Sequence, residues 1–243
     1  MDSSNELEYI RKQDSQGFRI YKIGDMKYLK KFATRADVDI MVVPNVVLIA
    51  DTGEVLYNMK MTGVYIQHID GSLITPSRWE AQGYSNNDAN GIAVMDEMAS
   101  FVISKMSLGT QYWSQNQGGY VEGVLLTSDE NAARLDYAGK QNSEIIASER
   151  IYSAARECVN FEFPNGAAGY LPALGELTIA NKYYSEMETA LALVGGTSLG
   201  SSWLLSSTQY KNNYAWYCNV STASASSIAF YNGATTRPFT SLK

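Results

Sequence analysis

Alternating apolar and polar residues predict two β-hairpins between residues 63 and 105. The first stretch reads GVYIQHIDGSLIT (63–75), and its Asp70-Gly71 dipeptide favours the tight turn of a hairpin. The second stretch reads ANGIAVMDEMASFVISK (89–105), and its apolar runs are separated near Asp96-Glu97. A period of two places every second side chain on the same face of a sheet, so both stretches are interpreted as strand pairs.

Further along the chain, the apolar period lengthens to that of an α-helix in two places. Asn142 or Ser143 can cap the first helix, and one of its faces carries Ile145, Tyr152, Ala155 and Val159. The second apolar stripe comprises Leu174, Leu177, Tyr184, Met187 and Leu191, and the helix is expected to end at Gly195-Gly196. We therefore expect helices near 142–160 and 174–194, with both stripes in the core.

The C-terminal segment differs from the rest of the chain in composition. Residues 189–243 contain no Asp or Glu. From residue 201 onward there are eight aromatic residues, interleaved with Ser, Thr, Asn and Ala: Trp203, Tyr210, Tyr214, Trp216, Tyr217, Phe230, Tyr231 and Phe239. This pattern favours short strands joined by long polar turns over a helix.

The N-terminal sixty residues indicate a separate small module. IMVVPNVVLIA (40–50) contains two apolar runs broken at Pro44-Asn45, and a turn at 51–54 leads into VLYNMKM. Residues 1–35 carry most of the early charge and are interpreted as a solvated or subunit-contacting segment. We predict a β-rich attachment or oligomerisation module over 1–60, followed by an α+β domain over 61–243.

Charge and hydropathy exclude some classes of partner. A net charge of −6 argues against binding nucleic acid or anionic membranes, since both require a basic surface. The sequence has no apolar run of about 18 residues, so no membrane insertion is expected. The polar start MDSSNELEYIRKQDSQ lacks the apolar core of a signal peptide. We expect a chain that is assembled in the cytosol or has lost a leader.

The two cysteines, Cys158 and Cys218, fall in different patterns. Cys158 lies in the first helical stripe, whereas Cys218 lies in the aromatic strand pattern. Spacing alone does not bring them together, so we predict two free thiols that behave as small apolar residues.

The sequence offers little of the chemistry that enzymes use. His68 is the only histidine, and it lies on an alternating strand, so no nucleophile–histidine pair is recognisable. One histidine and two distant cysteines do not make a zinc site, and no phosphate-binding glycine loop is present. No catalytic residue, metal or cofactor is therefore assigned. A pair of converging carboxylates stays open as an alternative and would make the protein a glycan hydrolase.

A set of short motifs resembles one known group of proteins. The motifs, in order, are GYLPALGEL (169–177), Gly195-Gly196-Thr197, Ser206-Ser207-Thr208-Gln209, Ala215-Trp216-Tyr217 and Arg237-Pro238-Phe239. They resemble the C-type-lectin-like domains of Bacteroidales phages and bacteria. These include variable proteins of diversity-generating retroelements and relatives of the Fibrobacter succinogenes major paralogous domain. The resemblance covers roughly residues 42–243.

The resemblance implies a C-type-lectin-like fold, with two helices packed on twisted antiparallel sheets. It also implies a C-terminal segment whose exposed residues face a ligand and, in retroelement members, are diversified. The usual calcium-binding triplets of lectins are absent, and Phe163-Pro164-Asn165-Gly166 is interpreted as a turn. A non-enzymatic receptor-binding protein of a phage tail is the main hypothesis, located in the virion. The alternative is a bacterial surface or pilus-tip adhesin on the cell surface.

Tyrosine and asparagine in the acid-free segment suggest the binding surface, because recognition surfaces favour large aromatic side chains. We predict one exposed patch made of Tyr210, Lys211, Asn213, Tyr214, Tyr217, Asn219, Ser221, Ser226, Tyr231 and Asn232. Trp216 and Phe239 are assigned to the core. The expected partner is a bacterial cell-surface protein or glycan, and the expected assembly is a homotrimer with contacts from residues 1–60.

Overall fold

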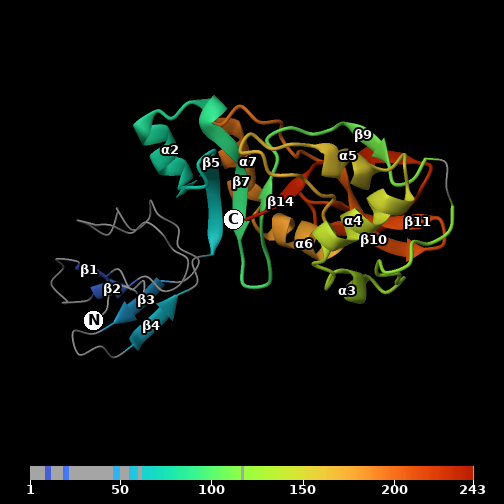
Figure 1. Cartoon of the computed structure of the whole chain (residues 1–243), viewed down its shortest axis with the longest axis horizontal. Helices are drawn as coiled ribbons and strands as arrows, with labels where there is room; N and C mark the ends of the chain where they lie inside the picture. Colours follow the sequence, from blue (N-terminus) through green and yellow to red (C-terminus); the bar gives the residue numbers. More distant parts are fainter. Residues whose placement is uncertain are drawn as a thin grey trace.

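The protein has an α+β fold, seen here in a computed structural model (Figure 1). The structure describes residues 62–115 and 118–242, together with the backbone of four short strands nearer the N-terminus. These strands pair antiparallel in chain order: β1 (Tyr9–Arg11), β2 (Arg19–Tyr21), β3 (Val46–Ile49) and β4 (Val55–Met59). The β3–β4 pair confirms the hairpin expected after Pro44, whereas most of residues 1–35 lie outside the described residues. A domain boundary near residue 60 and a role in attachment stay predictions.

The first five-stranded sheet contains both hairpins predicted from the alternating pattern. Its order is β14-β8-β7-β5-β6, and all neighbours are antiparallel. The strands are β5 (Gly63–His68), β6 (Leu73–Ile74), β7 (Ala89–Met95), β8 (Ser100–Ile103) and β14 (Phe239–Ser241). The last strand of the chain thus returns to pair with β8 and closes one edge of this sheet.

The centre of this sheet is tightly packed. All seven residues of β7 are buried, because other parts of the chain cover both faces of the strand. Gly91 lies where β7 meets β8, and a Cβ atom there would lie 2.5 Å from the carbonyl oxygen of Ile103. Only glycine fits at this position without moving backbone.

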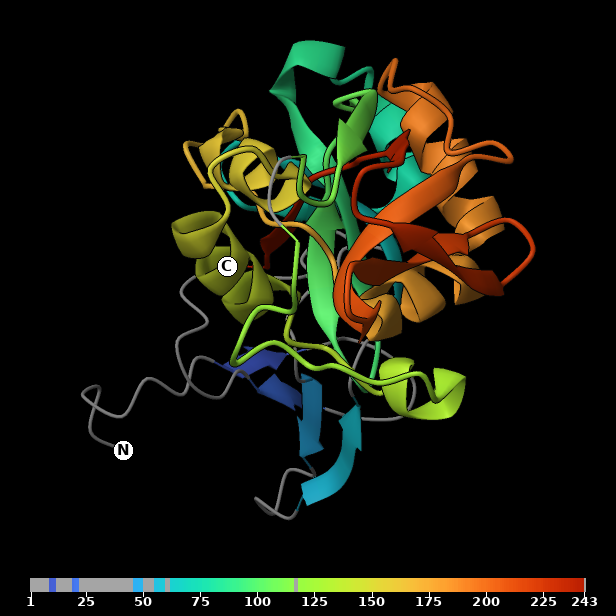
Figure 2. The same cartoon turned by 90° about the vertical axis from the view of Figure 1, so that its right-hand side faces the viewer.

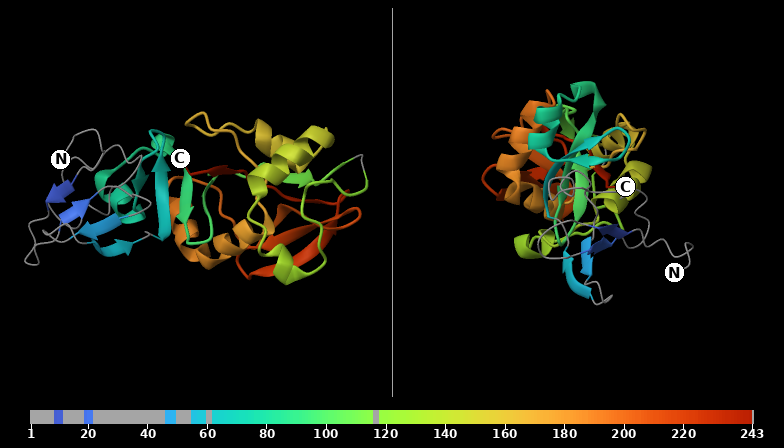
Figure 3. Two further views of the ribbon diagram at one scale, coloured as in Figure 1. Left: turned by 60° about the horizontal axis from the view of Figure 1, so that its bottom comes forward. Right: turned by 90° about the vertical axis from the view of Figure 1, so that its left-hand side faces the viewer.

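The second five-stranded sheet holds the C-terminal aromatic segment. Its order is β12-β11-β10-β13-β9, and only the β10–β13 pair is parallel. The strands are β9 (Thr110–Tyr112), β10 (Trp203–Lys211), β11 (Tyr214–Asn219), β12 (Ser224–Ala229) and β13 (Gly233–Thr235). In the left view of Figure 3, the teal β5 and the red strands of this sheet lie toward opposite ends of the C-terminal region.

Strands are confirmed in this segment, but the long polar turns expected between them are not found. The connection from β10 to β11 is only Asn212-Asn213. Asn213 adopts a left-handed backbone conformation with φ 64°. Asparagine tolerates this conformation better than most residues, so a two-residue turn suffices here.

The first predicted helix is wrong in detail, because two helices replace it. These are α4 (Gly139–Glu149) and α5 (Ala154–Asn160), preceded by the short α3 (Glu130–Ala133). The Ser153 side chain accepts a hydrogen bond from the Arg156 amide and caps α5, so the backbone leaves the helix between the two. Tyr152 lies in this break and is 62% exposed, so it does not belong to the apolar stripe.

The second predicted helix is also interrupted, at Tyr183. It forms α6 (Leu174–Lys182) and α7 (Tyr184–Leu193), which pack on different sheets: α6 on β10 and β11, α7 on β5 and β7. The predicted end is confirmed, since Gly195 has φ 66° and the Gly196 amide donates to the Leu191 carbonyl at 2.8 Å. This is the Schellman arrangement, which favours glycine. In the described residues, the other helices are α2 (Pro76–Gln82) and the 3₁₀ turn η2 (Asn86–Asp88).

Helices cover both faces of the C-terminal sheet. Figure 2 shows the olive and yellow helices α4 and α5 on one side and the orange helix α6, which packs on β10 and β11, on the other. Leu204 and Trp216 pack in one buried cluster with Leu177 of α6, whereas Leu205 and Ala215 pack with helices α4 and α5. Neighbouring residues of one strand therefore belong to different cores.

The cysteines lie in these two separate clusters as buried free thiols, which confirms the prediction from their patterns. Burial raises the pKa of Cys218 to about 11 and raises the pKa of Cys158 still further. Among the described helices, none has the length and apolar character needed to cross a membrane.

Candidate functional site

An open groove of about 600 Å³ lies on the C-terminal sheet, and all five strands of this sheet contribute to it. Thr110 comes from β9 and Trp203 from β10. The remaining lining residues come from β11, β12, β13 and the turn between the last two: Tyr214, Tyr217, Ser227, Ile228, Ala229, Asn232, Gly233, Ala234 and Thr235. The groove belongs to the face of the sheet that packs, further along, on α4 and α5.

Two aromatic rings lie against each other in this groove, and this pair is called the aromatic platform. Leu205 pairs with Tyr217 and Trp203 pairs with Asn219, so Trp203 and Tyr217 are diagonal neighbours on one face of the sheet. Their ring centroids are 4.5 Å apart and their planes meet at 33°. Both side chains are half-buried, which leaves part of each ring open to a ligand.

The polar groups of the groove are neutral. Thr110, Ser227 and Thr235 also border the groove, but the strand register places Thr235 beside Leu204 and Ser227 beside Trp216, on the face opposite Trp203 and Tyr217. Asn232 supplies an amide. Among the residues that the structure describes, no Asp, Glu, Lys, Arg or His lines the groove. The site therefore offers hydrogen bonds and aromatic contact without fixed charge.

Only part of the predicted binding set reaches this groove. Tyr214, Tyr217 and Asn232 line it. Lys211, Ser226 and Tyr231 are exposed but do not line it, and Tyr231 is 48% exposed. The remaining four have structural contacts, so the structure does not gather the predicted residues into one exposed patch.

The reason is that a strand alternates its side chains between two faces. Tyr210 lies on the face opposite Tyr217, with its ring edge-on to Trp216 at 4.9 Å between centroids. Lys211 places its ammonium 5.1 Å from the Tyr214 ring centroid and 5.3 Å from that of Tyr210. These cation–π contacts indicate that Lys211 packs on the two tyrosine rings at the end of the β10–β11 hairpin.

Asn213 and Asn219 of the predicted set form hydrogen bonds to backbone groups. Asn219 is 7% exposed, and its amide donates to the Ser201 carbonyl while its oxygen accepts from the Ser221 amide and hydroxyl. Asn213 accepts a hydrogen bond from the Gly119 amide at 2.7 Å. Both side chains shape the turns around the sheet.

The assignment of the core aromatics is confirmed. Trp216 is 4% exposed and Phe239 is fully buried. The Trp216 indole donates to the Thr127 carbonyl at 2.9 Å, and the Phe239 ring packs on Phe101 at 4.6 Å between centroids.

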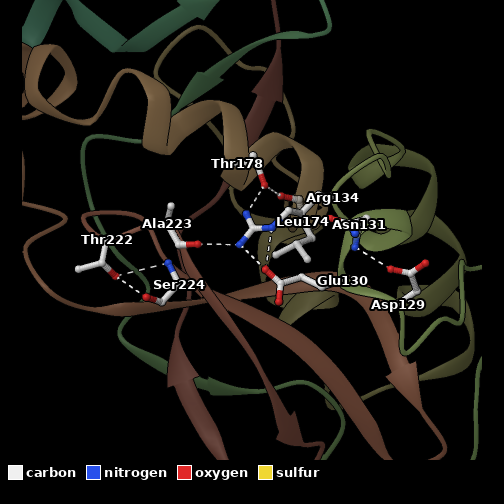
Figure 4. Close-up of polar contacts among 9 residues, drawn as sticks. All are labelled: Asp129, Glu130, Asn131, Arg134, Leu174, Thr178, Thr222, Ala223 and Ser224. Carbon is white, nitrogen blue, oxygen red and sulfur yellow. Dashed lines mark hydrogen bonds and ion pairs between the residues drawn. The ribbon is translucent and has the colours of Figure 1, made fainter.

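The outer strand β12 is held by Arg134 of the segment after α3 (Figure 4). The Arg134 guanidinium donates to the Ala223 carbonyl at 2.6 Å and to the Thr178 hydroxyl of α6 at 3.0 Å. It also pairs with Glu130 at 2.7 Å. The β11–β12 turn is thereby tied to two helices, which places the β12 wall of the groove.

Trp203, Thr110 and Thr235 line the groove but were not in the predicted set. Trp203 lies two residues before Leu205, which pairs with Tyr217, so Trp203 and Tyr217 share a face of the sheet. A correct register would therefore have indicated Trp203 as a groove residue. Thr110 gives no local signal, because it reaches the groove only through pairing of β9 with β13.

The carboxylates that come together in the described residues lie away from the groove. Asp136 accepts from Asn142 at 2.9 Å and from Thr208 at 2.8 Å, and is 7% exposed. Glu176 is 4% exposed and accepts from the Tyr170 hydroxyl and the Ala173 amide. Burial, with a smaller contribution from Asp136, raises the pKa of Glu176 to about 7. These contacts suit a structural network that joins α4, α6 and β10.

His68, a residue of the type most often used in catalysis, also forms a local structural contact. The His68 ring nitrogen Nδ1 lies 3.0 Å from the Asp70 carboxylate, within the β5–β6 turn. In the part of the chain that the structure describes, His, Cys, Asp and Glu side chains form no group of three suited to a metal ion.

Comparison with known proteins gives a similarity of fold. No family model and no curated protein matches the sequence. A crystal structure of a fimbrial protein from Bacteroides ovatus ATCC 8483 matches with a TM-score of 0.53 and 14% sequence identity. The match covers 95% of this chain and 68% of the fimbrial protein chain. At this level of identity the similarity shows the fold alone.

Proposed function

We propose that this protein is a non-enzymatic adhesin of the bacterial cell surface, and that the groove on its C-terminal sheet binds the ligand. The observation that carries the proposal is the groove itself. It combines an aromatic platform, Trp203 and Tyr217, with neutral hydrogen-bonding groups. Aromatic side chains beside neutral polar groups can contact both the apolar and the hydrogen-bonding parts of a ligand, and the polar part of this groove is the larger.

The absence of charged groups from the groove lining supports binding over catalysis. A glycosidase places two carboxylates on either side of the scissile bond, and none of the described residues that line the groove is an acid. The buried Asp136 and Glu176 are committed to hydrogen bonds within the core. Hydrolysis is therefore the less favoured hypothesis.

Location on the cell surface is proposed from the fold similarity to the Bacteroides ovatus fimbrial protein. That similarity favours an adhesin over a phage tail protein, for which the comparisons offer no support. A C-type-lectin-like domain, diversification of the C-terminal segment and a homotrimer are finer parts of the hypothesis. They rest on the sequence resemblance.

The test uses the full chain coupled to fluorescent beads and a panel of bacterial and host cell surfaces. We expect retention on a subset of surfaces, reduced by Trp203→Ala and unchanged by Tyr152→Ala. Tyr152 is a matched control because it is an exposed aromatic residue outside the groove. Incubation with the same surfaces should release no sugar. Release of sugar products would instead favour the hydrolase, and retention that ignores Trp203→Ala would exclude the groove.

A further inference from the structure

A second, smaller cavity of about 240 Å³ lies where three connecting segments meet beside the C-terminal sheet. One segment leads into β9, one joins α7 to β10, and one follows β13. Thr235 lies beside Leu204 and Thr110 beside Thr235, so these side chains lie on the face opposite the aromatic platform. We propose that this cavity binds a small monocarboxylate, held by Arg237. The site is separate from the groove, and the proposal goes beyond adhesion.

Arg237 has a donor that no group of the protein satisfies. The side chain is 2% exposed and lines the cavity. Its Nη1 donates to the Ser104 carbonyl at 3.2 Å, and its Nη2 donates to the Thr197 carbonyl at 2.7 Å. A guanidinium has more N–H groups than these two bonds use. The Nε atom is buried and finds no acceptor within the described part of the chain. A buried donor without an acceptor costs free energy, so a ligand oxygen beside Nε is favoured.

The positive charge of Arg237 also lacks a direct partner. Arg237 forms no ion pair with an acid among the described residues. The charge of Glu188 acts on Arg237, but the Glu188 carboxylate accepts from the Ser198 hydroxyl and the Leu199 amide instead. Burial lowers the pKa of Arg237 to about 10, because the charged form loses hydration. An anion in the cavity would offset this loss.

Neutral hydroxyls complete the lining of the cavity. Thr110, Ser202 and Thr235 line it, and within the described residues their hydroxyls form no hydrogen bond. Each hydroxyl can donate to a carboxylate oxygen. Thr197 and Ser198 of the lining are exposed, so the cavity opens to solvent. A ligand can therefore reach the cavity from outside.

Backbone hydrogen bonds hold the three segments together. The Leu108 amide donates to the Thr236 carbonyl, and the Thr236 amide donates to the Gly109 carbonyl, both at 2.9 Å. The Thr197 amide donates to the Lys105 carbonyl, also at 2.9 Å. The walls of the cavity are thus positioned before a ligand arrives, which lowers the entropic cost of binding.

Size and charge favour a small monocarboxylate over other anions. The volume of about 240 Å³ is below the range of drug-sized sites, which begins at about 300 Å³. A planar carboxylate fits the forked donors of a guanidinium. The negative charge of Glu188 disfavours a second negative charge on the ligand. Phosphate and sulfate, which carry more charge, should therefore bind less well.

The first experiment titrates the isotope-labelled full chain with acetate or lactate and records amide NMR spectra at constant ionic strength. Acetamide, phosphate and sulfate are the comparison probes. We expect both carboxylates to shift the signals of residues 107–110, 197–202 and 235–237 until saturation. Acetamide has a similar shape but no charge, and should bind about tenfold more weakly or less.

Three results of this titration would overturn the proposal. Equal binding of acetamide and acetate would show that the cavity does not select a charge. Tighter binding of phosphate or sulfate would exclude a carboxylate as the preferred ligand. If no probe shifts these signals, Arg237 has a structural role alone. Each of these results leaves the adhesin proposal intact, since the groove lies on the other face.

The second experiment compares two variants that each remove one positive charge. Arg237→Gln should weaken acetate binding about tenfold or more, and the preference for acetate over acetamide should disappear. Lys211→Gln is the matched control, because Lys211 belongs to the same acid-free segment but does not line the cavity. It should leave acetate binding unchanged. An equal loss in both variants would show general attraction to positive charge and would overturn the site.

Two further variants keep the test decisive if Arg237→Gln does not fold, because they leave the Arg237 contacts in place. Thr235→Val removes one hydroxyl and should weaken acetate binding about fivefold. Ser202→Leu places a larger side chain in the cavity and should abolish the acetate-induced shifts. Thermal unfolding checks that each variant is folded. Wild-type affinity for acetate in both folded variants would overturn the proposal.

Discussion

The two faces of the C-terminal sheet are used differently, and adjacent residues of β11 illustrate the difference. Trp216 points toward α6, is 4% exposed and donates its indole hydrogen to Thr127. Tyr217 points to the opposite face, where it is half-buried beside Trp203 in the groove. On one face α6 covers Leu204 and Trp216, whereas the other face is covered by α4 and α5 at one end and left open at the other. Stability and binding should therefore respond to different substitutions in the same strand.

The largest expected effect is on the covered face. Trp216→Ala and Phe239→Ala should each lower the free energy of unfolding by about 3–5 kcal/mol, because each leaves a cavity in the core. The exposed Tyr231→Ala should change it by no more than about 0.5 kcal/mol. Chemical denaturation monitored by circular dichroism measures all three. A small effect of Trp216→Ala would contradict the assignment of this face to the core.

The next effect concerns pH and the network at the base of α6. The pKa of Glu176 is raised from 4.5 to about 7, chiefly by burial. Between these values the folded chain keeps a proton on Glu176 that the unfolded chain has lost. The free energy of unfolding should therefore fall as pH rises from about 4.5 to 7, by at most about 3 kcal/mol from this group.

Glu176→Gln is the matched variant, because the amide stays neutral at every pH and can still accept from the Ala173 amide. Thermal unfolding between pH 4 and 8 should show a smaller loss of stability in Glu176→Gln than in the wild-type chain. Identical pH profiles would show that Glu176 does not hold its proton in the folded state.

A smaller effect is expected for binding on the open face. Tyr214 lines the groove, so Tyr214→Ala should weaken ligand retention by about 1–2 kcal/mol. Tyr231 does not line the groove, and Tyr231→Ala should weaken retention less. A titration of the beads against one retaining surface compares the two. If Tyr231→Ala had the larger effect, the ligand would lie across the β12–β13 turn and outside the groove.

The sequence pattern predicted the structure correctly where residues close together in the chain determine it. The two early hairpins follow from alternation and from Asp70-Gly71, and the end of α7 follows from Gly195-Gly196. Helix continuity failed, because the stripe through Tyr152 was counted across a break that Ser153 creates by capping α5. Capping is a local signal, so this break was accessible from the sequence.

The candidate site was only partly predictable, because the pairing of the strands decides which side chains lie on the face that carries the groove. Tyr210 and Tyr217 look alike in composition, yet Tyr217 pairs with Leu205, and Tyr210 lies an odd number of residues from Leu205 along β10, so alternation places the two tyrosines on opposite faces. Thr110 and Thr235 meet only when β9 pairs with β13. Composition identified the segment that carries the groove, whereas register decided which of its residues line it.

The smallest expected effect is at the turn that joins β11 to β12. Ala223 adopts φ 58°, a left-handed conformation that crowds the Cβ of alanine and suits glycine. Its carbonyl accepts from Arg134, and a glycine at 223 keeps that carbonyl. Ala223→Gly removes the strain, worth about 1–2 kcal/mol, but adds freedom to the unfolded chain, worth about 0.4–1 kcal/mol. We expect a net stabilisation of about 0.5 kcal/mol in chemical denaturation, with ligand retention unchanged because Ala223 does not line the groove.

Arg134→Lys is the complementary variant, since lysine lacks the forked guanidinium that reaches both Thr178 and Ala223. It should lower stability and, by loosening β12, also weaken retention. If Arg134→Lys left retention intact, the β12 wall would not depend on the Arg134 contacts.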